Sequence, residues 1–102
     1  MVKKTDVIIT KLRRLKRKYN AERMILFGSR ARWDFFEESD VDVLIISDKF
    51  RKKNMLQRMV DVQMNWDADQ FLESFCYTPE EFEKNKNRIG IIQKALEEGI
   101  EL

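Results

Sequence analysis

The stretch that decides the fold reads LFGSRAR at residues 26–32 and, after a polar segment, SDVDVLI at residues 39–45. Each half contains a short continuous run of apolar residues, which is the pattern of a strand buried on both faces. The first run ends at Gly28, and the second carries Asp42 inside it. We therefore predict two neighbouring strands with polar groups gathered at one end.

Periodicity outside this stretch predicts the remaining elements. Apolar residues at helical or alternating spacing mark them, and Thr78 opens one helix with a capping box and a first-turn proline. The predicted helices cover about residues 5–19, 29–35, 52–65, 78–87 and 88–98, and the predicted strands cover 24–27, 41–46 and 71–77. This order, α-β-α-β-α-β-α, predicts one α/β domain over residues 1–102, with a small mixed sheet flanked by helices.

Composition limits the chemistry that is available. The 102 residues are 43% hydrophobic and 37% charged, with a formal net charge of +2 and no histidine. The absence of histidine excludes His-based catalytic triads and His-ligated zinc. Cys76 is the only cysteine, so no disulfide forms within the chain. No run approaches the roughly 18 apolar residues of a membrane span, and no signal-peptide core is present. We expect a reducing, cytoplasmic location.

The two acids of the second half point to a metal site. Asp42 falls within an apolar strand, where an unpaired carboxylate is costly. Asp40 and Asp42 share one face of that strand, with Cα atoms roughly 7 Å apart, and they repel each other unless a cation lies between them. Oxygen ligands alone favour magnesium or manganese over zinc. The alternative is structural: Asp40 caps a turn and Asp42 pairs with a core arginine, since a D-x-D pattern is common.

The first half supplies groups that bind phosphate. Gly28 permits close approach of the backbone, and N–H groups at the start of a helix bind anions. The Ser29 hydroxyl adds a donor, and Arg30 and Arg32 can make charge-assisted contacts to phosphate oxygens. Each half is weak evidence alone. Together they place a phosphate site and a paired-carboxylate site within fifteen residues, as a nucleotide–magnesium complex requires.

The combined pattern, GSRAR at 28–32 and SDVDV at 39–43, resembles the signature of the minimal nucleotidyltransferases in the DNA polymerase beta-like superfamily. YTPEEF at 77–82 and ALEEGI at 95–100 are also similar to members of that family. The resemblance implies a mixed sheet flanked by helices, ATP or another nucleoside triphosphate as donor, and two divalent ions. It also implies that Ser39 belongs to the nucleotide site.

The family has a third carboxylate on the next strand, usually an Asp. Counting back from Tyr77 assigns it to Glu73, as a second-metal ligand or general base. Asp61, Asp67 and Asp69 are weaker candidates. These four acids stand at scattered positions before the predicted helix start at residue 78. A second departure is Trp33, where the family usually has Gly; such a bulky residue would cover the phosphate loop or form a contact surface.

Three functions compete. The first is adenylyl transfer to a tyrosine of a helical HEPN toxin, because the resembled proteins are commonly antitoxins of such toxins. The second is an inactive module that neutralises a partner by binding, which Glu73 and Trp33 favour. The third is transfer to a nucleic acid end, supported by six basic residues over 11–18. An open sheet edge also makes a homodimer plausible. Phe35 and Phe36 either pack under the motif or mark a partner surface.

Overall fold

The computed structural model describes residues 4–33, 35–36 and 38–102, with side chains from residue 7 onward in those ranges. Its elements are α1 (Lys4–Lys18), β1 (Arg23–Phe27), the 3-10 turn η1 (Gly28–Arg30), β2 (Val41–Ile46), the 3-10 turn η2 (Asp48–Phe50), α2 (Met55–Met64), β3 (Leu72–Tyr77), α3 (Pro79–Asn85), α4 (Ile91–Glu98) and β4 (Ile100–Glu101). Among these residues, no helix has the length and apolar character needed to cross a membrane.

The four strands form one mixed sheet in the order β3-β2-β1-β4. β1 pairs antiparallel with both β2 and β4, whereas β2 and β3 run parallel, with α2 in the connection between them. The predicted α/β class and small mixed sheet are therefore confirmed. β4 was not predicted, because a strand of two residues is too short to show a period.

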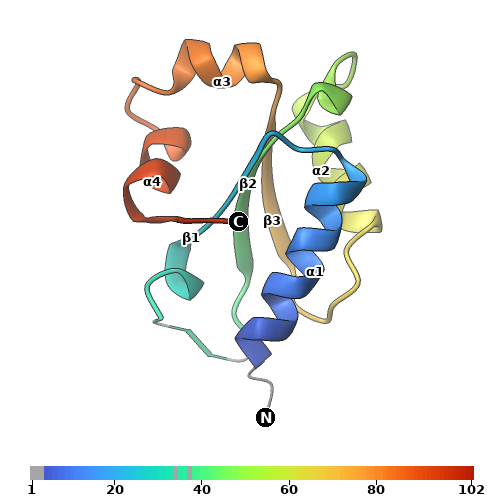
Figure 1. The fold of residues 1–102 in the computed structure, drawn as a ribbon, viewed down its shortest axis with the longest axis vertical. Helices are drawn as coiled ribbons and strands as arrows, with labels where there is room; N and C mark the ends of the chain where they lie inside the picture. Colours follow the sequence, from blue (N-terminus) through green and yellow to red (C-terminus); the bar gives the residue numbers. More distant parts are fainter. Residues whose placement is uncertain (1–3, 34, 37) are drawn as a thin grey trace.

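Helices cover both faces of the sheet (Figure 1). α1 and α2 pack on one face over the larger core, which includes Leu12, Val43, Val62 and Cys76. α3 and α4 pack on the other face over a smaller core around Leu44 and other residues. Successive residues of β2 belong to alternate cores, as the pleat of a strand requires. This alternation decides which helices face the acids of β2 and β3.

Several predicted helices begin or end differently in the structure, among them the one expected from residue 88, which begins at Ile91 after Gly90. The helix expected over 29–35 is the short turn η1, followed by further turns to residue 33. The helix expected from residue 52 begins at Met55, because Asn54 caps it: the Asn54 side chain accepts from the Gln57 N–H, and the Gln57 side chain accepts from the Asn54 N–H. The capping box predicted at Thr78 is present, with Glu81 as its partner.

Arg58, a buried arginine on α2, makes hydrogen bonds to η2, β3 and α3. Arg58 Nε donates to the Phe50 carbonyl at 2.9 Å, and Arg58 Nη1 donates to the Cys76 carbonyl at 3.1 Å and to Glu81 Oε1 at 2.7 Å. Arg58 is only 6% exposed. Its guanidinium therefore satisfies two buried carbonyls that no regular ladder serves.

We predict that Arg58→Ala lowers the free energy of unfolding by about 3 kcal/mol. The variant loses the donor of the buried Cys76 carbonyl, and it leaves the Phe50 carbonyl with only the Lys53 N–H and Glu81 Oε1 with only the Thr78 N–H. Urea unfolding followed by circular dichroism measures the loss. Arg51→Ala is the matched control, since Arg51 is exposed and makes only surface pairs with Asp48 and Glu80; its midpoint should barely move. Equal losses in the two variants would contradict this role for Arg58.

Candidate functional site

The strand register brings two acids side by side. Asp42 lies opposite Phe27 of antiparallel β1 and beside Glu73 of parallel β3. Asp42 shares its side of β2 with Leu44, and Glu73 shares its side of β3 with Phe75. Leu44 belongs to the smaller core and Phe75 packs against it, so both acids lie on the sheet face that α3 and α4 cover. We call Asp42 and Glu73 the carboxylate pair. Asp40 is exposed and precedes β2 by one residue.

Gly28 is required where β1 ends. Its φ is +75°, a left-handed conformation that glycine adopts without strain. A Cβ at this position would collide with Asp42 Oδ2. The Gly28 backbone therefore lies directly against the Asp42 carboxylate. Its approach to a phosphate stays a prediction.

The surroundings of Asp42 favour its neutral form. Burial, the hydrogen bond with Glu73 and the negative charges of Glu73 and Asp40 raise the pKa of the Asp42 carboxyl to about 6, against a smaller opposing effect of the Lys94 charge. A divalent cation placed at this pair would relieve the same repulsion. The raised pKa thus marks a position where positive charge is missing.

The carboxylate pair fits a magnesium ion that shares its coordination with a substrate. Among the residues that the structure describes, no three acids, cysteines or histidines converge closely enough to hold a metal by themselves. Magnesium, however, is usually held by one or two carboxylates together with phosphate oxygens and water. Asp42 and Glu73 supply such a pair, with Asp40 next to them. The metal roles of Asp40, Asp42 and Glu73 stay predictions.

Two donors of the expected phosphate site meet on one carboxylate oxygen. The Gly28 N–H donates to Glu98 Oε1 at 3.1 Å, and Arg32 Nη1 donates to the same oxygen at 3.2 Å. We call the Gly28 N–H and the Arg32 guanidinium the anion donors. Ser29 follows Gly28 in η1 and is half-buried. Sequence reasoning missed Glu98, because its partners lie 66 and 70 residues earlier.

Arg30 lies under the loop that leads into β2. It is 2% exposed, donates to the Ser39 carbonyl at 3.0 Å through Nη2, and packs over the Phe35 ring at 4.6 Å. Ser39 Oγ accepts from the Phe36 N–H at 2.9 Å. The contacts described for Arg30 and Ser39 therefore lie within the loop between η1 and β2. Their roles in binding nucleotide stay predictions.

Trp33 adopts a backbone conformation that explains why the resembled family has glycine here. Its φ is +60°, in the left-handed region that is costly for a bulky residue. Its side chain is 63% exposed, with the Trp33 and Phe35 ring centroids 6.1 Å apart. Phe36 is still more exposed, at 77%. The loop after η1 thus presents aromatic surface to solvent.

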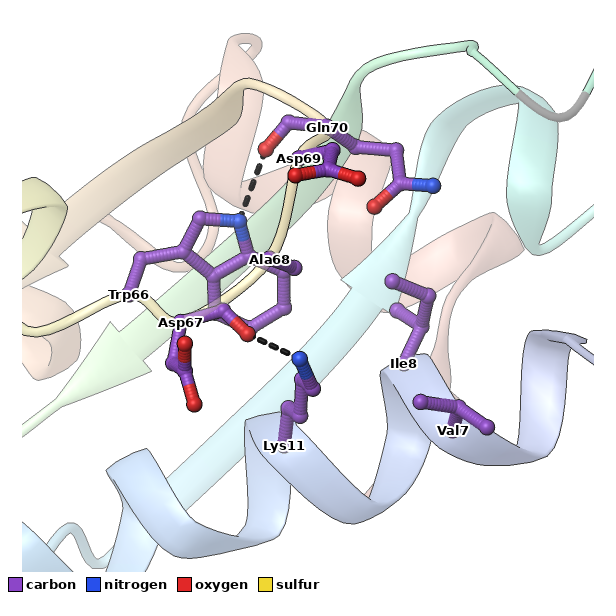
Figure 2. A pocket seen from close by; sticks show the side chains of 8 residues that line it. All are labelled: Val7, Ile8, Lys11, Trp66, Asp67, Ala68, Asp69 and Gln70. Atoms are coloured by element: carbon purple, nitrogen blue, oxygen red, sulfur yellow. Dashed lines mark hydrogen bonds between the residues drawn. The ribbon is translucent and has the colours of Figure 1, made fainter.

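The weaker candidates for the third carboxylate lie elsewhere. Asp61 on α2 accepts a hydrogen bond from the Tyr19 hydroxyl at 2.8 Å, in the α1/α2 layer. Asp67 and Asp69 line a pocket of about 380 Å³ between α1 and the loop after α2, next to Trp66 (Figure 2). Trp66 belongs to the larger core, so this pocket opens on the opposite face from the carboxylate pair. Of the four acids considered, only Glu73 lies beside Asp42.

Comparison with known proteins agrees with this geometry. Residues 8–101 match the family model described as a nucleotidyltransferase domain. The chain belongs to this nucleotidyltransferase family. The family resemblance inferred from the two motifs is confirmed, and its mixed sheet is the one observed.

Two curated relatives from Methanocaldococcus jannaschii match shorter segments of this nucleotidyltransferase. "Putative protein adenylyltransferase MJ0604" is 56% identical over 36 residues, which are 33% of this chain and 36% of that protein. "Putative protein adenylyltransferase MJ0141" is 46% identical over 41 residues, which are 40% and 41% of the two chains. The matched segments therefore span well under half the length of each relative.

A solved structure resembles the whole nucleotidyltransferase fold. It comes from Sulfolobus solfataricus and is described as "a putative nucleotidyltransferase". The match has a TM-score of 0.51 at 20% sequence identity and covers 99% of this chain and 87% of that one. This likeness supports the fold.

We predict that Asp42→Asn stabilises the metal-free protein at pH 7. The pKa of Asp42 is higher in the folded than in the unfolded chain, so the folded state binds the extra proton between about pH 4 and pH 6. Stability is therefore lost as the pH rises through that window. Removing the charge should recover about 1 kcal/mol, a value reduced for the water that reaches this half-buried side chain.

Thermal and urea unfolding in EDTA at pH 4.5 and pH 7.5 measure this effect. The gain should be present at pH 7.5 and shrink toward pH 4.5. A variant that is less stable than the wild type at pH 7.5 would show that neither burial nor the neighbouring acids disfavour the charged form of Asp42.

Proposed function

We propose that this nucleotidyltransferase uses magnesium and ATP, or another nucleoside triphosphate, to transfer a nucleoside monophosphate to a hydroxyl group of a protein. The observation that carries the proposal is that Gly28 lies against the carboxylate pair. A Cβ at position 28 would collide with Asp42 Oδ2, and Glu73 lies beside Asp42 on the neighbouring strand. Gly28 thus has the anion donors on one side and the carboxylate pair on the other, which supports a phosphate site next to a metal site.

The chain's residues divide the chemistry between them. Gly28, Ser29 and Arg32 would bind the phosphates, and Asp40, Asp42 and Glu73 would hold magnesium, whose charge would offset that of the triphosphate. The acceptor oxygen bonds to the α-phosphorus, the bond to the bridging oxygen breaks, and pyrophosphate leaves. Glu73 would take the hydroxyl proton. Such catalysis depends on positioning and charge, so a chain without histidine can perform it.

A protein acceptor is supported by the relatives. Both curated relatives carry the name of a protein adenylyltransferase, which favours AMP as the transferred group. We propose a tyrosine of a helical HEPN-type toxin as the acceptor, which makes this chain an antitoxin. The exposed aromatic residues Trp33 and Phe36, in the loop after η1, suit a partner surface beside the site.

We predict that magnesium-ATP binds the wild-type chain and that Asp42→Ala lowers its affinity at least tenfold, because the carboxylate pair is broken. Isothermal titration with and without magnesium measures this. Asp48→Ala is the matched control, since Asp48 is an exposed acid just beyond the other end of β2; its affinity should match the wild type. The same ATP affinity with and without magnesium, or wild-type affinity in Asp42→Ala, would contradict the proposed site.

Incubation with a HEPN-type partner and ATP labelled at the α-phosphate tests the transfer. Label should appear on a partner tyrosine with the wild type and not with Asp42→Ala, and ATP labelled at the γ-phosphate should leave none. A partner that is neutralised without label would indicate a binding module instead. Label on RNA would indicate the nucleic-acid alternative, with salt-sensitive binding through the basic residues of α1.

A further inference from the structure

The anion donors already hold an anion that belongs to the chain. The Gly28 N–H and Arg32 Nη1 converge on Glu98 Oε1 at 3.1 Å and 3.2 Å. A backbone N–H on a left-handed glycine and a guanidinium are donors that also suit a phosphate oxygen. A carboxylate oxygen and a phosphate oxygen accept from such donors in the same way. Glu98 thus takes the place of a ligand.

The Glu98 side chain is the movable part of this contact. Gly99 lies so close to β1 that a Cβ would collide with the Ile25 side chain, which fixes the end of α4 against the sheet. Ala95, one turn earlier, is fully buried on the same side of the helix. The Glu98 side chain remains 25% exposed, so water reaches it. Rotation about its own bonds can release the donors without displacing α4.

Helix stability does not explain an acid at this position. Glu98 is the last residue of α4, where the helix dipole disfavours negative charge. It also adds a carboxylate to a site that already holds Asp40 and the carboxylate pair. Its observed partners, the anion donors, are what offset these costs. The contact therefore concerns the site rather than the helix.

We propose that Glu98 occupies a phosphate subsite of the empty nucleotide site and is exchanged for a phosphate group when a triphosphate binds. This inference rests on the proposed function and adds a built-in competitor to it. An anion enters only if it binds the donors better than Glu98 does. A polyphosphate accompanied by magnesium meets that condition, because the metal at the carboxylate pair holds it as well. A small anion such as inorganic phosphate lacks that second attachment.

We predict that Glu98→Ala binds magnesium-ATP roughly five- to tenfold more tightly than the wild type, since the competing charge-assisted contacts are gone. Glu98→Gln should be intermediate, because its amide oxygen can still accept but carries no charge. Glu97→Gln is the matched control: it removes the same charge one residue away, on an exposed side chain. Its affinity should stay within about twofold of the wild type.

Titration of inorganic phosphate gives a second readout. It should bind Glu98→Ala measurably and the wild type far less. Thermal unfolding checks that each variant is folded, and the Gly28 amide resonance should shift in Glu98→Ala but not in Glu97→Gln. Weaker binding in Glu98→Ala would make Glu98 a positioning residue, and unchanged binding would make the contact incidental; either result overturns the exchange.

The two proposals fail in different ways. If the wild type binds magnesium-ATP and Glu98→Ala binds no more tightly, the exchange is wrong and the proposed function stands. If neither protein binds magnesium-ATP, the proposed function is wrong, and the exchange is wrong with it.

Discussion

The candidate site depends on one constraint: a carboxylate is held on the central strand of the sheet, where both neighbouring strands have fixed registers. Asp42 has β1 on one side and β3 on the other. The antiparallel register sets Phe27, the last residue of β1, opposite Asp42. The chain turns at Gly28, where a Cβ would collide with the Asp42 carboxylate. The parallel register sets Glu73 on its other side. A shift of one residue in either pair would send these side chains to the opposite face.

Charge in this region is unbalanced in a way that suits a nucleotide with magnesium. Asp40, Asp42 and Glu73 lie close enough that their charges and burial raise the pKa of Asp42 to about 6. Lys94 of α4 opposes this only in part, and Arg32 is engaged by Glu98. The site thus has too little positive charge around the carboxylate pair, while Glu98 occupies the anion donors. The proposed magnesium-bound triphosphate would meet both conditions at once.

Local signals in the sequence were enough to predict much of this arrangement. The bounds of β2 were predicted exactly, because a run of β-branched residues flanked by polar ones has a clear beginning and end. The start of α3 followed from the capping box at Thr78. The family resemblance, counted back from Tyr77, selected Glu73 as the third carboxylate, and the parallel register sets it beside Asp42. Its catalytic role stays a prediction.

The features of the fold and the site that were not predicted depend on contacts between residues far apart in the sequence or on backbone conformation. Nothing near Glu98 in the sequence points to Gly28, 70 residues earlier. Arg30 has the same side chain as Arg32, yet one is buried and the other exposed, and their spacing does not reveal which. The helix expected after Ser29 is a single turn, because Trp33 takes a left-handed conformation there. These features follow from tertiary packing, which composition and periodicity do not encode.

The most direct test of the central claim is a crystal of this chain grown with manganese and a non-hydrolysable ATP analogue, with data collected at the manganese absorption edge. Our account predicts an anomalous peak at the Asp42 and Glu73 carboxylates, with the analogue's phosphates on the Gly28 N–H and Arg32 and with Glu98 turned away. A peak at another position, or an analogue bound with no metal at the carboxylate pair, would contradict it.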